Sequence, residues 1–112
     1  MDEAPPPGDV ERVERFCLDR VPSARHHELR LDVVVADGGI EIHEAKTVLF
    51  GAPESWTTMP IARFACEPDG TYTLYSGNSD GQWDFYLDLE AHQILEVLID
   101  EVDQDPTGVF WG

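Results

Sequence analysis

Two acidic residues and one lysine in the first half of the chain have the spacing of a metal-dependent nuclease site. Asp32 lies twelve positions before Glu44, and Glu44 is followed two positions later by Lys46, which is the only lysine of the chain. In such nucleases both carboxylates hold a magnesium ion and the lysine lies beside the phosphate that is cleaved. Asp32 and Glu44 are therefore candidate metal ligands, and Glu44 and Lys46 are candidate catalytic residues.

The pattern around these residues predicts a β-hairpin. Apolar and polar residues alternate between positions 29 and 35, and the alternation resumes at positions 40 and 42. The sequence Asp37-Gly38-Gly39 between the two runs is typical of a tight turn, and we take the two glycines as its central residues.

The predicted hairpin opposes the nuclease interpretation. Its register brings Glu44 and Lys46 to the apolar face and leaves Asp32 on the other face with His43. A three-residue turn would place Asp32 on the same face as Glu44, but it would put the apolar residues of the two strands on opposite faces. We therefore expect Asp32 and His43 to form an ordinary cross-strand pair.

Glu44 needs a partner if it faces inward, because burying an unpaired charge is costly. Lys46 and Arg63 are the candidates, and we expect a non-catalytic ion pair. A small enzyme that uses a pocket around Glu44 remains an alternative.

Composition limits the kinds of partner. A chain of 112 residues with 42% apolar residues is long enough for one globular domain. Its formal net charge of -16 repels phosphate backbones and anionic lipids, so we expect neither direct nucleic-acid binding nor membrane binding. The acidic residues are scattered, which also disfavours a mimic of DNA.

The other residues that could do chemistry lack the spacing of a known site. Cys17 and Cys66 have no metal-binding spacing, and we expect both to be reduced, buried thiols. The tandem His26-His27 precedes the first strand, and His92 is expected on the exposed side of the last helix. No metal or other cofactor is expected, and without a signal peptide or a membrane span the expected location is the cytoplasm.

The periodicity of the whole chain predicts an α+β fold, namely a five-stranded antiparallel meander with an N-terminal and a C-terminal helix packed on one face. Residues 1–8 are expected to be a disordered proline-rich lead, and 9–112 a single domain. The predicted elements are a helix over 9–21 capped by Asp9, strands over 29–35, 40–46, 60–66, 71–76 and 82–87, and a helix over 89–103 capped by Asp88.

The order of these features resembles a family of small bacterial proteins known as domain of unknown function 3024. The resemblance extends over nearly the whole chain after the proline-rich lead. It rests on Arg30-Leu31, Glu44, the run Pro60 to Arg63, the Trp-x-x-Tyr of Trp83 and Tyr86, and the terminal Gly-x-Phe-Trp-Gly. In family members the glutamate at this position tends to be followed by x-Arg-Pro, whereas Glu44 is followed by Ala45-Lys46-Thr47. The resemblance therefore implies that a positively charged residue is needed at position 46, and that Glu-x-Lys is not a nuclease signature. It implies no activity.

We interpret the protein as a small, acidic, non-enzymatic protein-binding or adaptor module. A homodimer through the sheet is a further expectation. A third alternative uses the terminal Gly112, since ubiquitin-like modifiers end in glycine, and it requires a free tail. Aromatic residues and arginine dominate interface energetics. The candidate binding residues are Arg63, Tyr75 and Tyr86 on the outer face of the sheet, Trp56 in a long crossing loop predicted over 47–59, and Phe110 and Trp111 at the chain end. In the strand over 82–87, Trp83 and Phe85 are expected on the face opposite to that of Tyr86.

Overall fold

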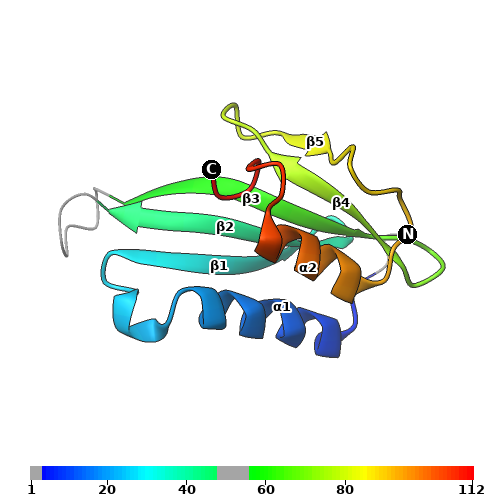
Figure 1. The fold of residues 1–112 in the computed structure, drawn as a ribbon. Helices are drawn as coiled ribbons and strands as arrows, with labels where there is room; N and C mark the ends of the chain where they lie inside the picture. The colour runs from blue at the N-terminus through cyan, green and yellow to red at the C-terminus, as the bar shows by residue number, and fades with distance from the viewer. Residues whose placement is uncertain (1–3, 48–55) are drawn as a thin grey trace.

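The computed structural model describes residues 4–47 and 56–112, and it has five strands and two α-helices in these residues (Figure 1). The elements are α1 (Pro7–Arg20), the 3-10 helix η1 (Ser23–Arg25), β1 (Leu29–Ala36), β2 (Gly39–Thr47), β3 (Trp56–Cys66), β4 (Tyr72–Gly77), β5 (Trp83–Phe85) and α2 (Leu95–Gln104).

The strands form one antiparallel sheet in the order β1-β2-β3-β4-β5. Both helices lie on the same side of this sheet, with α1 along β1 and α2 over β3 and β4 (Figure 1). This confirms the predicted α+β meander with a helix at each end of the chain. Among the described residues, no helix is long and apolar enough to cross a membrane.

The hydrophobic core fills the space between the helices and one face of the sheet. Side chains alternate along a strand, so every second residue of β2, β3 and β4 points toward the helices. The most completely buried of the large side chains in this layer are Phe64, Ile40, Ile42, Leu74, Leu98, Val13 and Val102.

Cys17 is part of this core, and burial together with the charges of Glu14 and Asp32 raises the pKa of its thiol to about 12. Such a thiol stays protonated at neutral pH and is a poor nucleophile.

The β1–β2 hairpin confirms the predicted faces but not the predicted turn. Ala36 is paired with Gly39, so Asp37 and Gly38 are the central residues, and both have positive φ angles. The register therefore differs by two residues from the predicted one. A shift of two leaves every side chain on its expected face, and Asp32 does lie opposite His43.

A β-bulge interrupts the pairing of β2 with β3. Ile42 is paired with Ala62 and His43 with Pro60, so Ile61 is the additional residue on β3. Proline suits such a position because it has no amide hydrogen for the ladder. β3 begins at Trp56, four residues before the predicted start, and residues 48–55 of the predicted crossing loop lie outside the described residues.

The first helix begins earlier than the sequence pattern predicts. Pro6 is its N-cap, Pro7 and Gly8 form its first turn, and Pro5 is buried, so the helix begins within the proline-rich segment 1–8. Proline favours the first turn of a helix because its φ is already helical. The predicted cap, Asp9, instead accepts a hydrogen bond from the Tyr72 hydroxyl at 2.7 Å.

The last helix begins six residues later than predicted. The segment before Leu95 is extended where Gln93 forms a bridge with Tyr72, and His92 has a φ of 63°. These contacts outweigh the helical pattern from residue 89 onward, so Asp88 is not its cap. His92 is exposed, as expected, but it lies in this segment and pairs with Asp69 at 3.4 Å.

The faces of β5 are the reverse of the prediction. Tyr86 is buried against Phe110, with ring centroids 5.2 Å apart, and its hydroxyl donates to Glu101 at 2.6 Å. Burial, together with this hydrogen bond, raises the pKa of Tyr86 to about 12. Phe85 and Trp83 consequently point away from the helices, in register with Tyr75 and Gly77.

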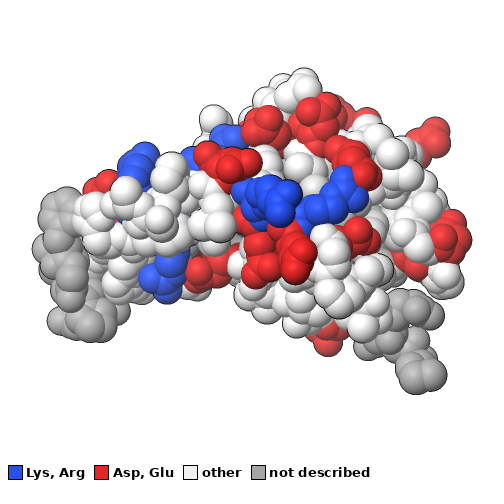
Figure 2. Space-filling view, turned by 90° about the horizontal axis from the view of Figure 1, so that it is seen from below, with Lys and Arg blue, Asp and Glu red and all other residues white. Residues whose placement is uncertain are grey.

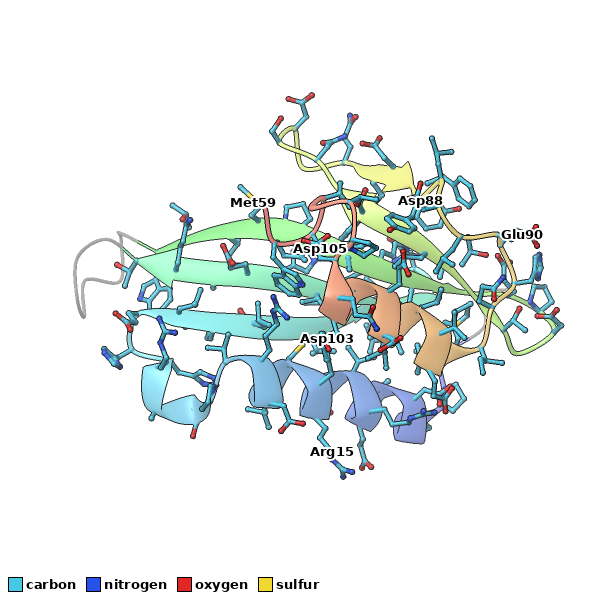
Figure 3. All side chains as sticks on the ribbon, viewed as in Figure 1. Arg15, Met59, Asp88, Glu90, Asp103 and Asp105 are labelled. Carbon is cyan, nitrogen blue, oxygen red and sulfur yellow. The ribbon has the colours of Figure 1, made fainter. Side chains whose placement is uncertain are left out.

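The C-terminal segment is docked on the helix layer. Asp105 ends α2 in the left-handed conformation, and its carboxylate accepts hydrogen bonds from the backbone amides of Phe110 (3.1 Å) and Trp111 (2.8 Å). The Trp111 indole donates to the Val102 carbonyl at 2.7 Å, and Arg20 stacks on its ring at 4.0 Å. Figure 3 places Asp105 at this junction.

Gly77 permits a close approach of two strands. A Cβ added at Gly77 would lie 2.1 Å from the carbonyl oxygen of Pro60, which is too close for any real contact. We expect Gly77→Ala to lower the free energy of unfolding by about 2 kcal/mol or more, because β4 must move away from the bulge. Urea unfolding measures this change. Gly8→Ala is the matched control, since a Cβ there meets no atom within 4 Å; a Gly77→Ala protein as stable as Gly8→Ala would contradict the close approach.

The two backbone amides held by Asp105 give a second prediction. Asn tolerates the left-handed conformation but offers a single acceptor oxygen, so Asp105→Asn should lower the free energy of unfolding by about 1–2 kcal/mol and shift the Trp111 fluorescence to longer wavelength. Asp103→Asn is the control, because its carboxylate is exposed and its ion pair with Arg20 contributes little. Equal effects of the two substitutions would argue against this cap.

Candidate functional site

The side of the sheet that faces away from the helices carries a row of side chains from all five strands. The paired positions are Val34, Glu41, Arg63, Tyr75 and Phe85. Because these residues alternate with the core residues of the same strands, they all point away from α1 and α2. We call this surface the helix-free face, and it also includes Arg30, Asp32, His43, Trp56 and Trp83.

Arg63 is the most highly connected residue of the helix-free face. Its Nη1 donates to the Glu41 carboxylate at 2.6 Å and to the Ala36 carbonyl at 2.9 Å, and its Nη2 donates to the Asp37 carbonyl at 2.8 Å. The guanidinium also lies against Gly39, where an added Cβ would be 2.8 Å from its central carbon. Arg63 thus attaches β3 to the β1–β2 turn.

The Arg63–Glu41 ion pair is largely removed from solvent. Only 13% of the Arg63 side chain and 11% of the Glu41 side chain are exposed. A charge pair this buried is maintained by additional hydrogen bonds, which here come from the two turn carbonyls and from His43. The His43 Nε2 lies 2.9 Å from the other oxygen of Glu41.

Aromatic rings surround this network. The rings of His43 and Trp83 form a T-shaped pair with centroids 5.9 Å apart, and Tyr75 and Phe85 form a second T-shaped pair at 6.0 Å. Phe85 is 42% exposed, while Tyr75 and Trp83 are half-buried. Large rings that are only partly covered are the residues that contribute most when a partner covers them.

Arg30 and Asp32 form the second charge pair of the face. The Arg30 Nε lies 3.0 Å from a carboxylate oxygen of Asp32, and its guanidinium stacks over Trp56 at 4.6 Å. The two arginines of the face are therefore matched by two carboxylates within it. The local charge is near zero, although the chain carries -16.

The nuclease arrangement, which the predicted hairpin disfavours, does not form in the part of the chain that the structure describes. Asp32 is opposite His43 whereas Glu44 is opposite Leu31, so the two carboxylates point to opposite faces of the sheet. Glu44 pairs with Lys46 at 3.9 Å, and Arg63, the other candidate partner, pairs with Glu41. Within residues 4–47 and 56–112, no three His, Cys, Asp or Glu side chains are grouped to hold a metal ion.

The predicted binding residues separate into two groups. Trp56, Arg63 and Tyr75 all lie on the helix-free face. The other three, Tyr86, Phe110 and Trp111, contact α2 and the core on the opposite side. Tyr86 was expected on the outer face, and this prediction is wrong. Phe85 pairs with Tyr75 and shares its outward face, so the next residue, Tyr86, points inward and is buried.

Six residues of the helix-free face were not predicted from the sequence as part of a site. These are Arg30, Val34, Glu41, His43, Trp83 and Phe85. Glu41 and His43 alternate with the apolar Ile40 and Ile42, which places them on the outer side of β2, and an arginine on the neighbouring strand was the available signal. The bulge at Ile61 decides which glutamate Arg63 reaches, and a bulge has no clear sequence signature.

A separate groove lies between α1 and α2, on the other side of the sheet. Its volume is about 580 Å³, and Phe16 and Ile99 contribute the apolar part of its lining. Ion pairs Arg12–Glu96 and Arg20–Asp103 cross between the helices, and Arg15 points away from the sheet (Figure 3). The helix side of the molecule carries many acidic side chains interspersed with arginines (Figure 2). The groove thus has carboxylates beside its arginines and no distinct anion site.

The whole chain, residues 1–112, matches the family model of a domain of unknown function, DUF3024, and the protein belongs to this family. No curated protein and no solved structure matches it.

The buried ion pair gives a prediction about stability. Arg63→Ala would leave the Glu41 carboxylate buried without its cation and three hydrogen bonds would be lost, so we expect the free energy of unfolding to fall by about 3 kcal/mol. Chemical denaturation of Arg63→Ala, Glu41→Ala and the double variant measures the coupling. The double variant should lose much less than the sum of the single ones.

Arg25→Ala is the matched control for this cycle. Its ion pair with Glu28 is exposed and local, so its loss should change stability by less than about 1 kcal/mol. Additive effects at Arg63 and Glu41 would show that the two charges do not depend on each other.

Proposed function

We propose that this protein is a non-enzymatic protein-binding module and that the helix-free face is where its partner docks. The observation that carries the proposal is one surface with partly exposed aromatic rings and internally paired charges, in a chain whose other surfaces are strongly acidic. The interaction is with protein, because the net charge of -16 disfavours nucleic acid and anionic membranes.

The residue types of the face support docking. The cores of protein interfaces are enriched in aromatic residues and arginine and depleted of unpaired charge. The helix-free face has Tyr75, Trp83 and Phe85 close to Arg63, and the exposed Val34 adds an apolar side chain on the other side of the Arg63–Glu41 pair. Each of these residues is positioned by a strand and not by a loop.

The rigidity of the face also supports docking. Side chains held in one arrangement before binding lose little conformational freedom on binding. Arg63 is fixed by contacts with three other residues, and His43 is held between Glu41 and Trp83. A partner would therefore meet a preformed surface.

The docked C-terminus disfavours the modifier alternative. Conjugation requires a flexible tail that enters an activating enzyme, whereas Phe110 is buried and the amides of residues 110 and 111 are held by Asp105. The catalytic alternative has no supporting observation around Glu44, whose partner is a lysine at an exposed position.

Matched lysine substitutions test the proposal. The tagged wild-type chain, Phe85→Lys and Leu18→Lys are used to capture proteins from the lysate of the source cells, with quantification by mass spectrometry. Leu18 is 52% exposed on α1, and its substitution changes the net charge by the same amount as that of Phe85. We expect a stoichiometric protein to be bound by wild type and Leu18→Lys and to be reduced at least tenfold with Phe85→Lys. Equal capture by both variants would overturn the proposed surface.

A further inference from the structure

We propose that the partner of the helix-free face is a second copy of this chain, so that two sheets pack face to face with the helices on the outside. This inference rests on the proposed function and names its partner. Sheets that pack in this way form sandwiches with the strands of the two layers nearly aligned. The resulting homodimer would have four layers, helix, sheet, sheet and helix.

Charge is the first argument for a second copy. Two chains that each carry -16 repel each other over most of their surfaces. Only a surface of low local charge can bring them together, and the charged side chains of the helix-free face are two arginines matched by two carboxylates, with His43 beside Glu41. Because the helix-free face has no net charge, it does not attract a basic partner electrostatically.

Desolvation is the second argument. Burying an exposed ion pair in an interface is costly because both ions lose water. Arg63 and Glu41 are already 87–89% removed from solvent within one chain, as their exposed fractions of 13% and 11% show. Covering them with a second sheet therefore removes little additional water. The other ion pair, Arg30–Asp32, has 40% of each side chain exposed, and it lies on the edge strand β1, where it can keep its water at the rim of the interface. The gain comes from Phe85, Tyr75, Trp83 and Val34.

The size of the face sets the expected affinity. Five strands about 4.8 Å apart and three rows of side chains cover roughly 24 by 20 Å, or about 500 Å². A standard interface buries about 800 Å² on each partner. Interfaces smaller than the standard size belong to weak or transient complexes, so the homodimer should form only at elevated protein concentration.

Salt distinguishes a second copy from a basic partner. Added salt screens the repulsion between two acidic chains, so it strengthens the homodimer. The attraction between an acidic chain and a basic protein weakens under the same change. Raising the NaCl concentration from about 20 mM to about 500 mM, which shortens the screening length severalfold, should therefore shift the protein toward dimer.

Sedimentation velocity over a range of protein concentrations, at both salt concentrations, tests the inference on the purified full-length chain. Wild type and Leu18→Lys are expected to shift from monomer toward dimer with concentration, and more so at high salt. Phe85→Lys and Val34→Lys should remain monomeric, although each lowers the negative charge of the chain by one and so reduces the general repulsion. Circular dichroism and thermal unfolding verify that each variant is folded.

The outcomes separate this inference from the proposed function. A wild-type chain that stays monomeric at all concentrations and both salts would overturn the homodimer, and so would a dimer that Phe85→Lys and Val34→Lys leave intact. If the chain is monomeric while a different protein is captured in a manner dependent on Phe85, the binding module stands and the second copy is excluded. If neither self-association nor Phe85-dependent capture occurs, both proposals fail.

Discussion

The arrangement of the helix-free face depends on the hydrogen bonds that the Arg63 guanidinium donates. The guanidinium joins the carbonyls of the β1–β2 turn, the Glu41 carboxylate and, through Glu41, the imidazole of His43. This requires a residue without a side chain at Gly39, against which the guanidinium lies. Because Arg63 and Glu41 are held against the sheet, their charges are largely shielded from water. The aromatic rings around them, above all Phe85, therefore form much of the exposed surface of this face.

The coarse fold could be predicted because the strand sequences have a period of two and because turn sequences such as Asp37-Gly38-Gly39 separate several of them. The first residues of the two helices could not be predicted, because they depend on contacts between particular residues. Pro7 is suited to the first turn of α1, and Gln93 pairs with Tyr72 where the periodicity alone predicts helix. The alternation of residues also could not predict which face of β5 is buried, since a strand of three residues is too short to show it.

The site could be predicted only in part for the same reason. Trp56, Arg63 and Tyr75 are visible as aromatic or cationic residues on the outer positions of strands, and the structure places all three on the helix-free face. The partner of Arg63 depends on the register of β2 with β3, in which Arg63 lies opposite Glu41 and the bulge at Ile61 shifts the pairing beyond it. This register is decided by packing between the strands, which neither Glu41 nor Glu44 reveals in the sequence.

The three tryptophans allow the most direct measurement of which face is used. Trp56 and Trp83 lie on the helix-free face, while the indole N–H of Trp111 donates a hydrogen bond to the Val102 carbonyl on the helix side. Their indole N–H signals can be followed by NMR on ¹⁵N-labelled protein as its concentration is raised in high salt. We expect the Trp83 signal to move and that of Trp111 to stay fixed. Movement of Trp111 without Trp83, or no movement at any concentration, would contradict an association through the helix-free face.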